Sequence, residues 1–316
     1  MAYECGCELQ SADVVYFMVH GAGMSAHSFA LLSEALTASN PAACTVAFDL
    51  RLHGASQYRG SDGVEDDLSL ERLCRDANRV LQSFVARVDD RTLQLVLIGH
   101  SLGGAVVTRL AGPADDSELS FRHDRHKLAA LVVIDIVEGT AIDALPAMAA
   151  VLDKRPVSFP SLDDAVRWAV DAGVPRNELS ARISVPPQLV RDASDGSCRW
   201  RTPLRDTTAF WPGWFANMSA CFVAARCPRL LLLAGDSDSR HGGAERLDSA
   251  LTAAHMQGRF QLEIMRGSGH ALHEDRPGVV AGHVAAFLQR LSGASQRSAL
   301  LEAANAKLRA QKAANI

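Results

Sequence analysis

The segment IGHSLGG, residues 98–104, indicates a sharp glycine-rich turn and raises the question of whether Ser101 is a nucleophile. Its first residue ends the apolar run LVLI at 95–98, and its last residue begins the run of small residues GAVV at 104–107. In a GxSxG motif the serine occupies a sharp turn from a strand into a helix, and the flanking glycines let the backbone pass without a Cβ clash. The three fixed positions of GxSxG occur by chance in roughly one in ten chains of this length. Companion motifs must therefore support the assignment.

Short apolar runs alternate with longer amphipathic runs along the chain. The apolar runs predict strands at 14–19, 45–50, 93–98, 128–135, 229–235 and 260–265. The amphipathic runs predict helices at 28–38, 68–88 and 277–291. This alternation is typical of an α/β fold with a mostly parallel sheet flanked by helices.

One long segment interrupts the alternation. Residues 140–226 are poor in strand signals and contain all four tryptophans, so we expect a helical lid inserted between two strands of the C-terminal half. The tryptophans either fill the core of this insertion or line the site, since pockets favour aromatic side chains. The predicted core is then 1–139 with 227–291, and 292–316 is a helical or flexible tail. The polar stretch 113–127 reads as a solvated loop.

Composition narrows the classes of partner. The formal net charge of −4 gives no basic field for nucleic acid or acidic lipid, and no apolar run is long enough to span a membrane. The seven cysteines lack CxxC spacing and the N-terminus does not resemble a signal peptide, which favours reduced thiols in the cytoplasm, with the nucleus as a second compartment. No phosphate loop, HExxH or EF-hand pattern is present, so we expect neither cofactor nor metal.

The motif HGAG at 20–23 directly follows the first predicted strand. Hydrolases with a GxSxG turn use a glycine-rich turn at this place to bind the oxyanion, together with the N–H that follows the nucleophile. We assign these two donors to the backbone of Ala22 and Leu102.

The general base should follow the last strand, where GSGHALHED at 267–275 contains His270. A serine hydroxyl is a poor nucleophile until an imidazole accepts its proton. His273 is the main rival. We prefer His270 because its small neighbours Gly269 and Ala271 let the ring approach the serine.

The residues alone leave more than one candidate for the acid that orients the histidine. Asp135 ends one predicted strand, and Asp236 and Asp238 follow another, which is the commoner position for the acid in this fold. Sequence logic slightly favours Asp238, and Glu138 reads as a surface or supporting group. Asp49, Arg51 and His53 are expected to brace the loops.

With these motifs in place, the chain from about residue 14 to 291 resembles the protein phosphatase methylesterases, a family of α/β-hydrolases. Generic hydrolases share HG and GxSxG but lack the more specific stretches. Those stretches are VVIDIVEGTAIDALPAM (132–148), RPVSFPSLDDAVRWAV (155–170), SCRWRTPL (197–204), FWPGWF (210–215), LLLLAG (230–235), MQGRFQLEIM (256–265) and GHALHED (269–275).

The resemblance implies an enzyme that removes the methyl ester from the C-terminal leucine of the protein phosphatase 2A catalytic subunit. It implies Ser101 as nucleophile, His270 as base and Asp135 as acid, which overturns the preference for Asp238. Two alternatives stay open: a small-molecule carboxylesterase, and a phosphatase-binding protein without turnover. Family members carry early strands before HG, whereas only residues 1–13 precede the first predicted strand here. Either that early part is lacking here or the sheet has lost an edge.

Overall fold

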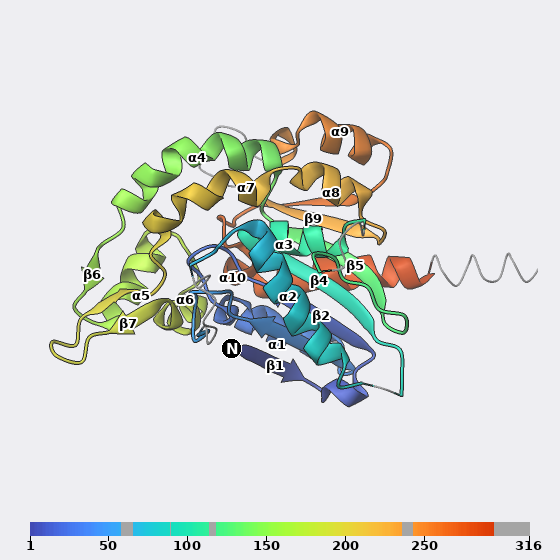
Figure 1. The fold of residues 1–316 in the computed structure, drawn as a ribbon, viewed down its shortest axis with the longest axis horizontal. Coiled ribbons are helices and arrows are strands. Elements are labelled where there is room, and N and C mark those ends of the chain that lie inside the picture. The colour runs from blue at the N-terminus through green and yellow to red at the C-terminus, as the bar shows by residue number, and fades with distance from the viewer. Residues whose placement is uncertain (58–65, 89, 114–117, 236–242, 294–316) are drawn as a thin grey trace, which may run out of the picture.

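The computed structural model describes residues 1–57, 66–88, 90–113, 118–235 and 243–293, which fold around a seven-stranded sheet of order β1-β3-β2-β4-β5-β9-β10 (Figure 1). β1 pairs antiparallel with β3, and the other neighbouring strands pair in parallel. The strands are β1 (Ala2–Gly6), β2 (Val14–Val19), β3 (Ala43–Phe48), β4 (Gln94–His100), β5 (Lys127–Ile134), β9 (Arg229–Ala234) and β10 (Gln261–Met265).

Helices cover both faces of this sheet. One face carries α2 (Leu70–Val85), α3 (Leu102–Ala111), α8 (Met218–Ala224) and α9 (Ser249–Met256). The opposite face carries α1 (Ala30–Ser39) and the helix over residues 277–293. The α/β-hydrolase class of fold, with its parallel sheet and flanking helices, is confirmed.

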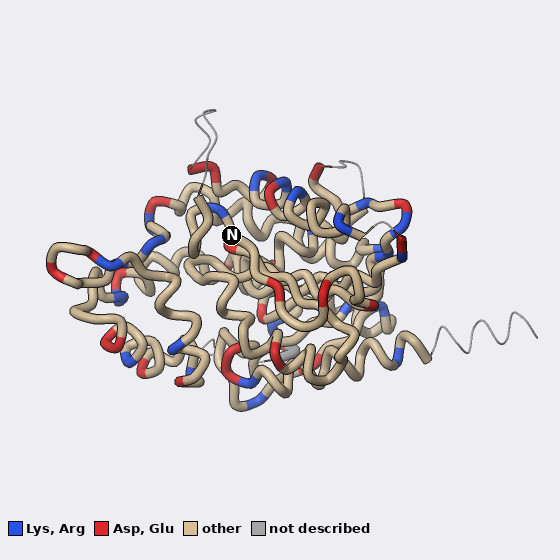
Figure 2. The backbone as a smooth tube through the Cα atoms, turned by 90° about the horizontal axis from the view of Figure 1, so that it is seen from below, with Lys and Arg blue, Asp and Glu red and all other residues tan. Residues whose placement is uncertain are grey.

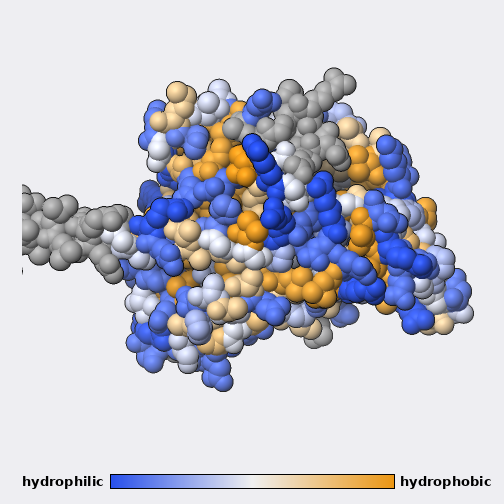
Figure 3. All heavy atoms as spheres, turned by 180° about the vertical axis from the view of Figure 1, so that it is seen from behind, coloured by the Kyte–Doolittle hydropathy of each residue, from blue (hydrophilic) through white to orange (hydrophobic). Residues whose placement is uncertain are grey.

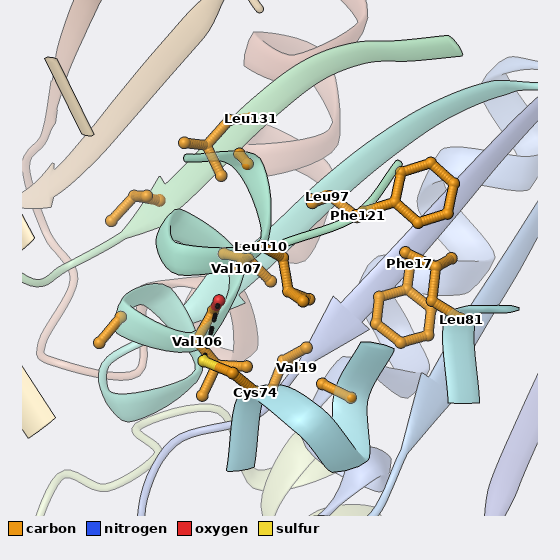
Figure 4. Close-up of a cluster of buried hydrophobic side chains, with 14 of the residues drawn as sticks. Phe17, Val19, Cys74, Leu81, Leu97, Val106, Val107, Leu110, Phe121 and Leu131 are labelled. Carbon is orange, nitrogen blue, oxygen red and sulfur yellow. Dashed lines mark hydrogen bonds between the residues drawn. The ribbon is translucent and has the colours of Figure 1, made fainter. Parts of the chain in front are cut away.

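The two faces divide the side chains of each central strand. In β2, Phe17 and Val19 join the core beneath α2 and α3, whereas Met18 points into the core beneath α1. This follows from the two-residue period of a strand, and because both faces are covered the run is apolar throughout. Figure 4 shows Phe17 and Val19 together with Leu81 of α2 and Val106 of α3.

The six predicted strands are confirmed, with β3 lying two residues earlier than expected. The alternative that no strand lies before the first predicted one was wrong, because Ala2–Gly6 forms β1 along the free side of β3. This strand was not predicted since its residues are half-buried or exposed and carry no apolar run. Its short, partly polar sequence is typical of an edge strand.

The segment between β5 and β9 contains helices and a second sheet of order β6-β8-β7. Its strands are two or three residues long, which is too short for an apolar pattern to reveal. Phe159 and Cys198 of this sheet pack with Ala165 and Val166 in a separate small core. Besides α8 and two 3-10 helices, Pro186–Gln188 and Leu204–Phe210, the elements are α4 (Glu138–Asp153), β6 (Ser158–Phe159), α5 (Leu162–Asp171), α6 (Glu178–Ser184), β7 (Leu189–Arg191), β8 (Cys198–Trp200) and α7 (Trp211–Phe215).

The structure describes only part of the predicted tail and of the polar stretch 113–127. Residues 294–316 of the predicted tail lie outside the described residues, as do 114–117 of the polar stretch. The remainder of that stretch is not simply solvated, because Phe121 is 3% exposed and packs in the main core (Figure 4). Its aromatic ring outweighs the polarity of its neighbours.

The described surface mixes charges of both signs. Figure 2 shows Lys and Arg interspersed with Asp and Glu along the tube. On the side seen in Figure 3, apolar residues form separate patches between polar ones. No helix within the described ranges is both long and apolar enough to cross a membrane.

Candidate active site

Ser101 occupies the turn between the end of β4 and the start of α3. Its backbone has φ 51° and ψ −120°, a conformation that L-residues rarely adopt. Such strain persists only where the surroundings enforce it, and it is the hallmark of the strand-to-helix turn of a GxSxG motif. Ser101 therefore has the strained backbone expected of the serine in a GxSxG turn.

The glycines around Ser101 allow elements to approach more closely than any side chain would permit. A Cβ built on Gly103 would lie 2.0 Å from the carbonyl oxygen of Val19, and one on Gly99 would lie 2.2 Å from the carbonyl oxygen of Gly103. A Cβ on Gly21 would lie 3.2 Å from Ser101 Cβ. The HGAG turn therefore packs directly against the serine.

His270 and Asp135 are brought together from positions 135 residues apart in the chain. The two groups are joined by a 2.7 Å hydrogen bond between His270 Nδ1 and Asp135 Oδ2. Asp135 follows β5 with φ 50° and is 1% exposed, whereas the His270 side chain is 48% exposed. A buried carboxylate on Nδ1 fixes the tautomer of the imidazole and leaves Nε2 available for proton transfer.

The Asp135 carboxylate has further partners. Its Oδ1 accepts from the backbone N–H of Ala234 at 2.8 Å and contacts Nη1 of Arg246, a side chain that is itself buried. Burial alone would raise the pKa of Asp135, but the bond and charge of His270, the charge of Arg246 and the Ala234 N–H outweigh it and lower the pKa. Asp135 is thus held as the anion.

Arg246 was missed by sequence reasoning. It lies on the short 3-10 helix Gly243–Arg246, 111 residues beyond Asp135 in the chain. No motif surrounds it, and a lone arginine after a strand reads as a surface residue. Only the fold reveals the contact.

The other candidate acids have different positions. Asp236 and Asp238 lie outside the described residues. Glu138 accepts hydrogen bonds from the backbone N–H groups of Asn217 and Ser219, at 2.9 and 2.8 Å, where α8 begins. A carboxylate at a helix N-terminus has a structural role, as expected for this residue.

His273, the rival base, is fully buried near the site. Its ring centroid lies 4.4 Å from that of His100 and 4.8 Å from that of Phe29, and neither ring nitrogen forms a hydrogen bond to a described residue. Burial, followed by the charge of His270, lowers the pKa of His273 to about 3, against a weaker opposing effect of Asp135. The structure therefore joins His270, rather than His273, to Asp135.

The two expected oxyanion donors belong to segments next to Ser101: Leu102 follows it in the chain, and Ala22 follows Gly21, whose Cβ would lie 3.2 Å from Ser101 Cβ. Leu102 is the first residue of α3, so its N–H has no acceptor within the helix. In the HGAG turn, Gly23 N–H donates to His53 Nε2 at 2.9 Å and Met24 N–H to the Gly21 carbonyl at 3.1 Å. The N–H of Ala22 donates to no described residue, which is the state that binding an oxyanion requires.

The loop DLRLHGAS at 49–56 braces the HGAG turn. Asp49 accepts from the N–H groups of Ala26 and Ala55, each at 2.9 Å. His53 Nδ1 donates to the Arg51 carbonyl at 2.7 Å while Nε2 accepts from Gly23, which requires a neutral ring. Burial lowers the pKa of His53 to about 4, although the Arg51 carbonyl and Asp49 act in the opposite direction.

Comparisons with known proteins establish the class first. Residues 17–283 match the family described as the alpha/beta hydrolase family, so the chain is an α/β-hydrolase. Among solved structures, E-2-(acetamidomethylene)succinate hydrolase aligns with a TM-score of 0.67 at 19% identity, over 91% of this chain and 94% of that one. An esterase from Mycobacterium tuberculosis aligns with a TM-score of 0.60 at 21% identity, over 92% of each chain. These likenesses concern the fold.

Curated relatives then define the family. Protein phosphatase methylesterase 1 of Schizosaccharomyces pombe is 40% identical over 86% of this chain and 73% of its own. The protein of that name from Aspergillus fumigatus is 39% identical, with 91% and 65% covered, and a probable one from Caenorhabditis elegans is 35% identical, with 87% and 69% covered. The chain belongs to the protein phosphatase methylesterase family.

Proposed function

We propose that this protein is a serine carboxyl methylesterase that demethylates the C-terminal leucine of the protein phosphatase 2A catalytic subunit. The observation that carries the proposal is the His270–Asp135 hydrogen bond beside the strained Ser101, in a chain 40% identical to a protein phosphatase methylesterase. These groups suit acyl transfer from an ester.

In the first half of the reaction, Ser101 Oγ attacks the carbonyl carbon of the methyl ester while His270 Nε2 takes the hydroxyl proton. The negative charge that develops on the carbonyl oxygen is stabilised by the N–H groups of Ala22 and Leu102. Collapse of the tetrahedral intermediate breaks the bond to the methoxy oxygen. His270 gives its proton to that oxygen, and methanol leaves.

In the second half, a water molecule attacks the acyl-serine ester while His270 removes its proton. Collapse of the second tetrahedral intermediate breaks the bond between the acyl carbon and Ser101 Oγ, His270 gives its proton to Oγ, and the leucine carboxylate is released. Asp135 keeps its negative charge throughout and stabilises the imidazolium at both stages.

Proton transfer from Ser101 needs one adjustment of the site. Within the described residues, no hydrogen bond joins Ser101 Oγ to His270, and the carbonyl of His270 lies 2.9 Å from His100 Nε2. Catalytic hydrogen bonds often form only in the Michaelis complex. We therefore expect Ser101 Oγ and His270 Nε2 to come within hydrogen-bond reach when the ester binds.

Selectivity for a phosphatase must arise away from the small methyl ester. Residues 140–226 lie next to the HGAG turn, since a Cβ on Gly23 would approach Leu204 Cδ1 to 2.7 Å. Thr202 Oγ1 donates to the Leu52 carbonyl at 2.8 Å. We assign substrate recognition to this insertion, which acts as a lid over the site. We also propose that the enzyme acts in the cytoplasm and in the nucleus.

The deciding experiment measures methyl release from the full-length methylated phosphatase catalytic subunit. The wild type should release methanol and Ser101→Ala should not, while Ser83→Ala, an exposed serine of α2, serves as the matched control. Cleavage of aryl esters with no release from the phosphatase would favour a small-molecule carboxylesterase. Tight binding without turnover would favour a non-catalytic phosphatase-binding protein.

A further inference from the structure

Arg155, between α4 and β6, has its guanidinium fixed in one plane. The guanidinium carbon lies 3.7 Å from the ring centroid of Trp200. Trp200 is held in turn, because its Nε1 donates to the Pro156 carbonyl at 2.8 Å and its ring packs edge-on against Phe159 and Trp168. Stacking on an aromatic face leaves the N–H groups at the edge of a guanidinium available to a ligand.

This guanidinium lies beside the turn that carries the proposed oxyanion donor Ala22. A Cβ built on Gly23 would lie 3.7 Å from Arg155 Nη1. Leu204, from the same insertion, approaches Gly23 from nearby. A fixed cation therefore stands one residue away from the oxyanion donor.

Arg155 also lacks a carboxylate partner. Some exposed arginines of the insertion have one, as Arg182 does with Glu178 at 2.7 Å and Arg199 with Asp192 at 3.0 Å. Among the described residues no carboxylate pairs with Arg155, and burial lowers its pKa to about 10. Arg155 is half-buried, and a charge that is partly withdrawn from water without a carboxylate partner is unfavourable; beside a reaction centre, such a charge indicates a ligand.

We propose that Arg155 is a specificity-determining residue that binds a carboxylate of the substrate chain next to the ester. This inference rests on the proposed methylesterase function and adds the chemical class that the site selects. The carboxylate has two sources: an acidic side chain shortly before the methylated leucine, or the leucine carboxylate that hydrolysis produces. Arg155 favours an acidic tail in the first case and retains the product in the second.

Binding measurements with a Ser101→Ala background separate these sources without turnover. The probes are dye-labelled peptides that end in leucine methyl ester, with one Asp or the matching Asn at each of the four preceding positions, and the neutral parent as free acid. Fluorescence anisotropy gives the dissociation constants. The variants are Arg155→Gln, Arg155→Lys and, as a matched control, the exposed Arg199→Gln.

The acidic-tail source predicts that one Asp peptide binds about 10- to 100-fold more tightly than its Asn partner, because a hydrogen bond to a charged group is that strong. Arg155→Gln should abolish this ratio, Arg155→Lys should keep part of it, and Arg199→Gln should leave it unchanged. If the carboxylate is that of the product, the neutral parent peptide should bind more tightly as the free acid than as the methyl ester. This ratio of dissociation constants should respond to the three variants in the same way.

The role of Arg155 is refuted if neither the Asp-to-Asn affinity ratio nor the acid-to-ester affinity ratio exceeds one. It is equally refuted if both ratios persist in Arg155→Gln. The neutral methyl ester guards against misfolding, since a general defect weakens its binding equally. Methyl release from the intact phosphatase is measured in parallel on the wild type. Its absence would refute the proposed function, whereas normal release with unchanged ratios would refute the role of Arg155 alone.

Discussion

Arg246 Nη1 contacts Oδ1 of Asp135, the oxygen opposite the one that His270 engages. The candidate acid is therefore shared between a permanent cation and the candidate base. Part of its negative charge is balanced by Arg246 even when His270 is neutral. This weakens the support that Asp135 gives to a protonated imidazole.

The first prediction concerns Arg246→Met. With the cation gone, Asp135 should favour the protonated imidazole more strongly, so the acid limb of the kcat/KM profile should move to higher pH. The variant should also lose about 3–5 kcal/mol of stability, because a buried pair is broken. Arg246→Lys keeps the charge and should shift the profile less. An unchanged profile in folded Arg246→Met would contradict this role.

The second prediction tests the acid itself. Asp135→Asn should lower kcat on the order of 10⁴-fold, because the amide cannot hold the imidazole in the working tautomer. Asp238→Asn should cost little. Both are measured as methyl release under saturating substrate. A larger loss at Asp238 would reverse the assignment made from the family resemblance.

The third prediction concerns Glu274 in α10 (Leu272–Asp275), which is 1% exposed. Neither carboxyl oxygen has a hydrogen-bond partner of good geometry among the described residues. Burial raises the pKa of Glu274 to about 8; the nearby Ser184 hydroxyl opposes the shift and Asp275 adds to it. The folded protein thus keeps a proton that the unfolded chain loses near the ordinary glutamate pKa of 4.5.

Because the folded state binds more protons between these two values, stability should fall as pH rises from about 4.5 to about 8, by up to ~1.4 kcal/mol per unit. Glu274→Gln removes this loss. The free energy of unfolding of the variant, relative to that of the wild type, should therefore grow with pH and level off above about 8. Urea unfolding at several pH values measures the difference. Glu178→Gln, an exposed glutamate of α6, is the control, and a pH-independent difference for Glu274→Gln would refute the prediction.

The sequence predicts most of the fold and the centre of the site for identifiable reasons. The central strands are apolar on both faces, and Ser101 and His270 lie in local motifs whose order along the chain is fixed. Asp135 needed the family resemblance, because Asp238 also follows a strand. Arg246 and the stacking of Arg155 on Trp200 depend on contacts between distant segments, which no local pattern encodes. β1 escaped prediction because an edge strand does not need an apolar run.

The fourth prediction contrasts two glycines. Gly103→Ala would drive a Cβ to 2.0 Å from the Val19 carbonyl oxygen, so α3 must move away from β2 and carry Ser101 with it. We expect the free energy of unfolding to fall by about 2–4 kcal/mol, as in an overpacked core, and most of the activity to be lost. Gly282→Ala is the control, since it lies inside the helix over 277–293 and a Cβ built there would meet no described atom within 4 Å. It should gain about 0.5–1 kcal/mol at unchanged activity. Equal thermal stability of the two variants would show that the close approach at Gly103 is dispensable.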